Sequence, residues 1–189
     1  KAALVWWEPR KGGAESPHVV FESDKADVSG GMSNPDTYEP EAVTVNYLRP
    51  EWNVLSEAIA PDIAAIGKLD QGDFSIGSRN KDNTKWIVAY NRDNGPPRYW
   101  LWDRDTQKGR FLFTTWPALE GAALASMRSV EVPTRDGMKM PSYLTVPVGS
   151  AGKNLPMVLF VHGGPWARDS WGYNPYHQWL ANRGYAVLS

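Results

Sequence analysis

Two adjacent glycines, Gly163 and Gly164, mark the part of the sequence where chemistry is most strongly indicated. They lie between His162 and Pro165 and follow an apolar run from Met157 to Val161. Such a run is typical of a strand buried on both faces, as in parallel sheets. Glycine lets the backbone approach a ligand closely, and open α/β sheets bind ligands beyond the carboxyl ends of their strands. The stretch therefore predicts a ligand-contacting turn at the end of a buried strand.

The histidines are the side chains that could transfer a proton near neutral pH. A general base needs a nucleophile and an orienting acid within hydrogen-bond reach, and the sequence around His162 places neither. We therefore expect a structural role for His162. We expect His177 at the surface or in a local hydrogen bond. The spacing of these two residues and His18 indicates no metal site.

Composition excludes several classes of protein. The 189 residues carry a formal net charge of -1 with scattered lysines and arginines, which argues against a nucleic-acid partner. No apolar run of about 18 residues is present, so no membrane-spanning segment is expected. The absence of cysteine excludes disulfides, thiolate metal sites and a cysteine nucleophile. Nothing indicates a cofactor. The oligomeric state and the compartment, cytoplasmic or periplasmic, stay open, since the sequence shows no signal peptide at Lys1.

Short antiparallel strands are expected over most of the first hundred or so residues. Clusters of glycine, proline, asparagine and serine separate segments rich in β-branched and aromatic residues. The later strands recur about every dozen residues, as in one blade of a β-propeller, although a sandwich has similar spacing. The expected strands are Ala2–Trp7, His18–Glu22, Ala42–Leu48, Asp73–Arg79, Lys85–Asn91, Arg98–Asp103 and Arg110–Thr114.

Between Asn53 and Asp70 the apolar residues change to helical spacing. Despite Pro61, this pattern predicts an amphipathic helix near residues 54–70 whose apolar stripe serves packing. The residues of the stripe are Leu55, Ile59, Ile63, Ile66 and Leu69.

The C-terminal third has the pattern of half a doubly wound α/β unit. A boundary is expected near Pro117–Ser126, followed by a hairpin around Arg135-Asp136-Gly137. After the glycine turn, Asn174 and Pro175 predict the start of a helix. The remaining expectations are hairpin strands at Val130–Val132 and Met138–Val146, a buried helix stripe of Tyr176, Trp179 and Leu180, a helix end at Gly184, and a strand from Tyr185 to Leu188.

Three stretches together resemble a known family. These are Arg135-Asp136-Gly137, Tyr143–Pro147 and the whole of Leu155–Ser189. They resemble the junction between propeller and catalytic domain in the prolyl oligopeptidase family of serine peptidases, and most closely its acylaminoacyl-peptidase-like and dipeptidyl-peptidase-like branch. Upstream, Trp86–Asp103 and Leu112–Met127 are similar to the last propeller blade and its exit.

The resemblance implies acyl transfer through a serine nucleophile, with histidine as base and aspartate orienting it. In the family, the turn that corresponds to His162–Pro165 supplies a backbone N–H to the oxyanion hole. Carried over to this sequence, that role falls on Gly163 or Gly164. A fixed amide donor of this kind stabilises the developing negative charge by about 3 kcal/mol. His162, Pro165, Trp166 and Arg168 are candidates for the lining of a substrate pocket, and core packing of Trp166 with a local salt bridge of Arg168 and Asp169 is the alternative that stays open.

The expected fold is mixed β and α/β. Residues 1–125 would form the final antiparallel blades of a partial β-propeller, and residues 126–189 the start of an α/β-hydrolase sheet. The family nucleophile lies in a Gly-x-Ser-x-Gly elbow after the strand that begins at Tyr185, and this sequence contains no such elbow. We therefore expect the serine, aspartate and histidine downstream of Ser189. The parent enzyme would act on peptides, and this truncated chain would be inactive by itself.

A non-catalytic binding module is the alternative that the sequence leaves open. Trp86 and the segment Tyr99–Trp102 could form an aromatic surface for a glycan or a peptide, although such residues more commonly pack in a core. Calcium binding by Asp93, Asp103 and Asp105 is not indicated, since their spacing matches no metal loop. Nucleotide binding at the glycine turn lacks the Gly-x-Gly-x-x-Gly spacing.

Overall fold

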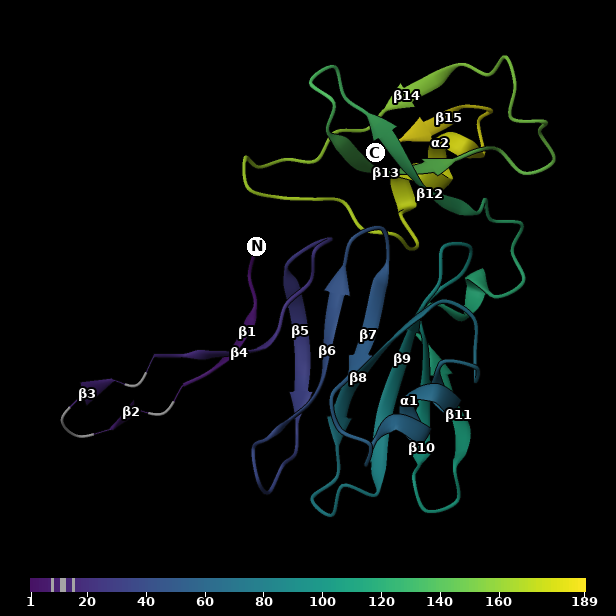
Figure 1. Cartoon of the computed structure of the whole chain (residues 1–189). Coiled ribbons are helices and arrows are strands. Elements are labelled where there is room, and N and C mark those ends of the chain that lie inside the picture. Colours follow the sequence, from purple (N-terminus) through teal and green to yellow (C-terminus); the bar gives the residue numbers. More distant parts are fainter. Residues whose placement is uncertain (8, 11–12, 15) are drawn as a thin grey trace. The chain divides into compact units, whose positions relative to one another are not determined.

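Short β-strands are the predominant regular elements in the computed structural model of the chain, which describes residues 1–7, 9–10, 13–14 and 16–189 (Figure 1). The described residues form two compact units, Lys1–Ala64 and Ala65–Ser189. In the described ranges, no helix is long and apolar enough to cross a membrane.

The first unit consists of small antiparallel sheets. Strand β6 lies between β5 and β7, and its side chains Ala42, Val43 and Val45 are buried. The strands expected near the start of the chain are confirmed as β1, β4 and β6, with slightly different ends. The bounds are β1 (Leu4–Trp6), β2 (Pro9–Arg10), β3 (Gly13–Ala14), β4 (His18–Phe21), β5 (Val28–Ser33), β6 (Pro40–Asn46) and β7 (Pro50–Val54).

The helix expected near residues 54–70 is shorter than the apolar spacing suggested. Residues Pro50–Val54 form β7, and helix α1 spans only Ala60–Ile66. Pro61 lies in its first turn, where the missing N–H costs no helical hydrogen bond, and this explains the late start. Ile59, Ile63 and Ile66 are buried, so these members of the predicted stripe do serve packing.

Four antiparallel strands follow in the spatial order β11-β10-β9-β8 (Figure 1). Their bounds are β8 (Asp73–Arg79), β9 (Lys85–Asn91), β10 (Arg98–Asp103) and β11 (Lys108–Thr114). The first three match the expected strands residue for residue, and the fourth begins two residues before the expected Arg110. Trp86, Val88 and Tyr90 of β9 alternate toward the buried face, which is the period-two pattern of a strand with one covered face.

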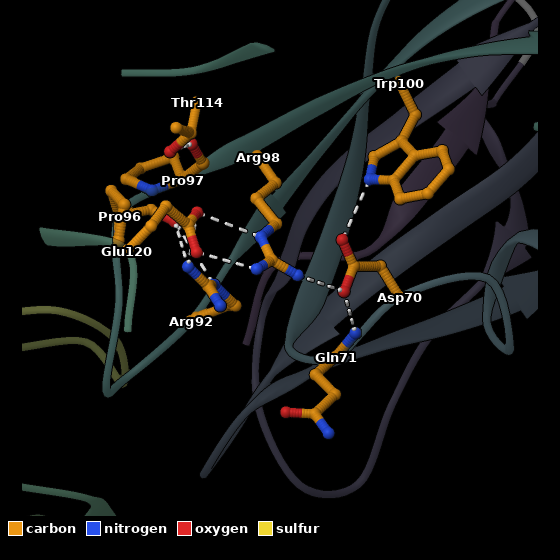
Figure 2. A network of polar contacts seen from close by, with 9 residues as sticks. All are labelled: Asp70, Gln71, Arg92, Pro96, Pro97, Arg98, Trp100, Thr114 and Glu120. Carbon is orange, nitrogen blue, oxygen red and sulfur yellow. Dashed lines mark hydrogen bonds and ion pairs between the residues drawn. The ribbon is translucent and has the colours of Figure 1, made fainter. Parts of the chain in front are cut away.

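A polar network connects this sheet to the segments that flank it (Figure 2). Glu120, which follows the short 3-10 helix Pro117–Leu119, accepts two hydrogen bonds from the Arg98 guanidinium, at 3.0 and 2.7 Å. Arg92 Nη2 donates to the same carboxylate at 3.0 Å. Asp70 accepts from Arg98 Nη1 at 3.3 Å and from Trp100 Nε1 at 2.8 Å. The hydrogen bonds of Arg98 lower the pKa of the Glu120 carboxyl to about 2.

The C-terminal sheet has the strand order β12-β13-β15-β14. The hairpin expected at Arg135-Asp136-Gly137 is confirmed between β12 and β13, and Gly137 has a φ of 83°. Strands β14 and β15 are parallel and are connected by helix α2. The bounds are β12 (Met127–Pro133), β13 (Lys139–Thr145), β14 (Met157–Leu159), α2 (Pro175–Ala181) and β15 (Ala186–Leu188).

The prediction that Met157–Val161 is a strand buried on both faces is wrong. Strand β14 ends at Leu159, and Met157 and Leu159 are 57% and 63% exposed. Among the described residues the strand pairs only with β15, at one end of the sheet. Helix α2 contacts this region through Phe160, whose ring stacks on Tyr176. Alternate side chains of β14 therefore remain on an uncovered face.

Helix α2 begins as predicted but buries a different face. Asn174 Oδ1 accepts hydrogen bonds from the backbone N–H groups of Tyr176 and His177, at 2.9 and 3.2 Å, and so caps the helix. The expected buried stripe is wrong, because Tyr176 and Trp179 are 59% and 55% exposed. The residues that the helix buries are His177, Gln178 and Ala181.

Replacement of Glu120 by glutamine should remove an acid-sensitive source of stability. The Glu120 pKa is lowered from 4.5 to about 2 in the fold, so its ionised form stabilises the chain above about pH 4.5 and this contribution is lost as the pH falls toward 2. Glu120→Gln should lower the free energy of unfolding by about 1–3 kcal/mol at neutral pH. Urea unfolding at a series of pH values measures both effects.

The exposed Asp105 offers a matched control, since Asp105→Asn changes the charge equally in the β10–β11 turn. We expect this variant to keep the wild-type acid dependence. An unchanged acid dependence in Glu120→Gln would contradict the role assigned to Glu120.

Candidate functional site

The glycine turn follows β14 and begins from an anchored residue. Phe160 N donates a hydrogen bond to Leu188 O at 2.8 Å, which extends the pairing with β15 past the end of the strand. The Phe160 ring stacks on Tyr176, with centroids 5.4 Å apart, and meets His177 edge-on at 5.8 Å. The segment entering the turn is therefore fixed by both β15 and α2.

The turn itself leaves two backbone donors accessible. Gly163 and Gly164 are exposed, and within the described part of the chain neither N–H donates a hydrogen bond. His162 Nδ1 lies 2.7 Å from Gly163 O and donates to it, because a carbonyl oxygen can only accept. A Cβ added at Gly163 would have no atom within 4 Å. This arrangement leaves space for a ligand atom to approach the two amides.

Arg168 lies beyond the turn and is held by a neighbouring strand. Its Nη2 donates to the hydroxyl of the buried Tyr143 at 3.0 Å, and its Nε donates to Asp169 O at 3.2 Å. Sequence analysis did not identify Tyr143 as a partner, since the two residues are 25 positions apart. The hydrogen bonds fix a cation close to the glycine turn.

A cavity of about 370 Å³ adjoins the turn and includes two of the predicted pocket residues. His162 and Arg168 contribute to its lining, whereas Pro165 and Trp166 do not. Trp166 is 98% exposed, and the Gly164–Pro165 peptide bond is cis. The other lining residues are Met140, Pro141, Ser142, Tyr143, Leu159, Phe160, Val161, Asp169, Leu188 and Ser189. Largely apolar walls that carry the Arg168 guanidinium and the Asp169 carboxylate suit a ligand that is mainly apolar and carries a polar group.

His177 is fully buried, so the prediction that it lies at the surface is wrong. Its hydrogen bond is also not local, because the partner is distant in the sequence. Its Nδ1 lies 3.0 Å from Thr145 Oγ1 of β13, and its Nε2 is buried without a hydrogen-bond partner in the described structure. Burial lowers the pKa of the imidazole, although the charge of Asp169 acts in the opposite direction. The neutral ring is therefore the form that this site favours.

The aromatic residues considered as a glycan platform are mostly engaged in packing. Trp86 and Trp102 are buried, and Trp100 donates to Asp70. Tyr99 stacks on Phe113 at 4.8 Å. Trp86 and Trp102 thus cannot stack on a sugar in this fold. Among the described residues, no group of three His, Asp or Glu side chains converges as metal ligands do.

Comparison with known proteins finds relatives among peptidases. No protein-family model matches the chain. Over 178 residues the chain is 45% identical to dipeptidyl aminopeptidase BIII of Pseudoxanthomonas mexicana, an alignment that covers 90% of this chain and 26% of that protein. The chain thus spans about a quarter of the length of this relative.

Solved peptidase structures contain a similar fold. A puromycin-hydrolysing peptidase of Mycobacterium tuberculosis matches with a TM-score of 0.62 and 20% identity, over 96% of this chain and 29% of that chain. The acylaminoacyl peptidase of Pyrococcus horikoshii matches with a TM-score of 0.55 and 16% identity, over 92% and 26%. These structural similarities concern the fold alone. Together with the sequence relative, they confirm the resemblance to the prolyl oligopeptidase family and its acylaminoacyl-peptidase and dipeptidyl-peptidase members.

The burial of His177 predicts a loss of stability in mild acid. Its pKa is below 6.5 in the fold, so the unfolded chain binds the proton more readily and the free energy of unfolding falls as the pH drops below about 6.5. His177→Gln should weaken this dependence, as measured by urea unfolding between about pH 7 and pH 5. The exposed His18→Gln variant serves as the control and should unfold like the wild type. A wild-type pH dependence in His177→Gln would refute the assignment.

Proposed function

We propose that the chain is part of a serine-type peptidase that hydrolyses short peptides or acyl-peptides by acyl transfer. The observation that carries this proposal is the 45% identity to dipeptidyl aminopeptidase BIII over 90% of the chain. The glycine turn supports it, because the turn falls within the aligned part of this chain and presents accessible backbone N–H donors. The substrate of the whole protein would be a peptide.

The contribution of this chain to the chemistry would be half of an oxyanion hole. When a nucleophile attacks a peptide carbonyl, negative charge develops on the carbonyl oxygen. The N–H of Gly163 or Gly164 would donate to that oxygen, and the hydrogen bond would strengthen as the charge grows. His162 would hold the turn through its contact with Gly163 O. The turn by itself forms and breaks no covalent bond.

The nucleophile, the base and the acid would come from other parts of such a protein. The chain has no Gly-x-Ser-x-Gly elbow, and His177 is buried beside Thr145, away from solvent. His162 is directed to a backbone carbonyl instead of a serine. We infer that the 189 residues alone do not catalyse hydrolysis.

The proposed fold assigns two roles to the chain. Residues 1–125 would belong to a β-propeller, because the four antiparallel strands β8–β11 have the number and arrangement of strands in one blade. Residues 126–189 would begin an α/β-hydrolase domain, for which the parallel pair β14 and β15 with helix α2 between them is the characteristic unit. His162, Pro165, Trp166 and Arg168 would then border the substrate pocket.

A fluorophosphonate probe tests whether the serine lies outside this chain. We expect stoichiometric labelling of the natural full-length protein and no labelling of the 189-residue chain, because only the former would contain an activated serine. Mass spectrometry locates the label. Labelling of a serine within residues 1–189 would contradict the proposed division of roles.

Substitution of Gly163 by alanine in the full-length protein tests the oxyanion turn. The added methyl group meets no atom of this chain within 4 Å, so the fold should tolerate it, but it would occupy the approach to the amide donors. We expect kcat for a dipeptide p-nitroanilide to fall by about 10²–10³-fold, as for the loss of an oxyanion donor. Gly77→Ala in β8, where the Cβ would make an ordinary contact with Ile87 O at 3.8 Å, is the matched control. A kcat within about threefold of the wild type in Gly163→Ala would exclude this role.

A further inference from the structure

Gln178 of helix α2 uses its whole side-chain amide to join three segments. Its Nε2 donates to Ala125 O at 2.7 Å and to Asp93 O at 3.1 Å, and its Oε1 accepts from Ala125 N at 2.8 Å. Ala125 precedes β12, and Asp93 lies in the loop between β9 and β10. Because the side chain is buried, each of these hydrogen bonds replaces one to water that the group has lost.

Further hydrogen bonds connect residues close in sequence to Asp93, Ala125 and Gln178. Asp93 Oδ2 accepts a hydrogen bond from Met127 N at 2.7 Å, and Asn91 Nδ2 donates to Trp171 O at 3.2 Å. Trp171 Nε1 in turn donates to Met127 O at 2.7 Å. A Cβ at Gly172 would collide with the Asn91 side chain, so only glycine lets the backbone pass so close to Asn91. We call the side chains of Asn91, Asp93, Trp171 and Gln178 the junction clamp.

The junction clamp and the glycine turn meet on the same helix. Tyr176 and His177 contact the Phe160 ring, and Gln178 is the next residue along α2. Phe160 lies two positions before His162, at the entry to the turn. A displacement of α2 would therefore move the ring against which the entry segment packs. Both N–H groups and the oxygen of the Gln178 amide are engaged, so these hydrogen bonds hold α2 at one position relative to Ala125 and Asp93.

We propose that the junction clamp positions the oxyanion turn by fixing helix α2 against the loop between β9 and β10. Gln178 is then a positioning residue for the reaction, which acts through Phe160 and touches no substrate. This inference rests on the proposed peptidase function. It goes beyond that function because it assigns a catalytic consequence to a contact remote in sequence from the turn.

Gln178→Glu in the full-length protein tests the proposal. A carboxylate has the shape of the amide but cannot donate to Asp93 O and Ala125 O, so α2 should lose its fixed position. Since the amide donors of the turn act mainly on the charge that develops in the transition state, we expect kcat to fall at least about tenfold with KM within about twofold. Trp179→Leu, on the exposed side of the same helix, is the matched control and should keep the wild-type kcat.

Hydrogen exchange gives a readout that does not depend on activity. In Gln178→Glu, the amide of Phe160, which donates to Leu188 O, should exchange about tenfold faster, whereas those of β9 and β10 should be unchanged. A folded Gln178→Glu variant with wild-type kcat and wild-type exchange at the Phe160 amide would overturn the proposal. If Gln178→Glu does not fold, Asn91→Ala removes a single contact of the clamp and is judged by the same criteria.

The two proposals fail in different ways. If the wild-type full-length protein hydrolyses no peptide substrate, the proposed function is wrong, and the exchange rate of the Phe160 amide still decides whether the clamp positions the turn. If the wild type is active and both clamp variants retain its kcat, the function stands and the role of the clamp is refuted.

Discussion

The buried face of helix α2 is polar, and the C-terminal part of the structure depends on satisfying it. A buried amide or imidazole without partners costs about 1–3 kcal/mol for each lost hydrogen bond. Gln178 finds its partners on Asp93 and Ala125, and His177 finds one on Thr145. The helix can therefore occupy only the position at which these groups meet. An apolar stripe would have allowed small rotations and shifts, because dispersion contacts are not directional.

The antiparallel sheet β8–β11 could be predicted in detail because its determinants are local. Alternating apolar residues and turn-forming asparagines and glycines set the period and the ends of the strands. The two hairpins of β8–β10 accordingly match the expected limits. Helix α1 was overestimated because the apolar spacing before Ala60 is shared by β7, and only Pro61 marked the true start. The local sequence thus predicted which helices and strands form better than it predicted their lengths.

The candidate site was predictable only in part. The cap at Asn174 is encoded in adjacent residues and lies where the pattern places it, whereas β14 ends three positions before His162 instead of directly at the turn. Tyr143 lies 25 positions from Arg168, and the partners of Gln178 lie 53 or more positions from it, so no local pattern could reveal these contacts. The burial of β14 was overestimated because a run of apolar residues indicates a strand but not the neighbours that cover it. The buried face of α2 was predicted wrongly for the same reason, since aromatic residues on a helix indicate packing only when a partner surface lies opposite them.

The spatial order β12-β13-β15-β14 has a consequence for how the chain is assembled during synthesis. Strand β14 leaves the ribosome before α2 and β15, yet it pairs only with β15 in the described structure. Strand β14 therefore stays unpaired until about thirty more residues have emerged, because Leu159 pairs with Leu188. Synthesis at roughly 5–20 residues per second makes this interval on the order of seconds. During that time the apolar strand that precedes the glycine turn has an unpaired edge that can associate with other chains.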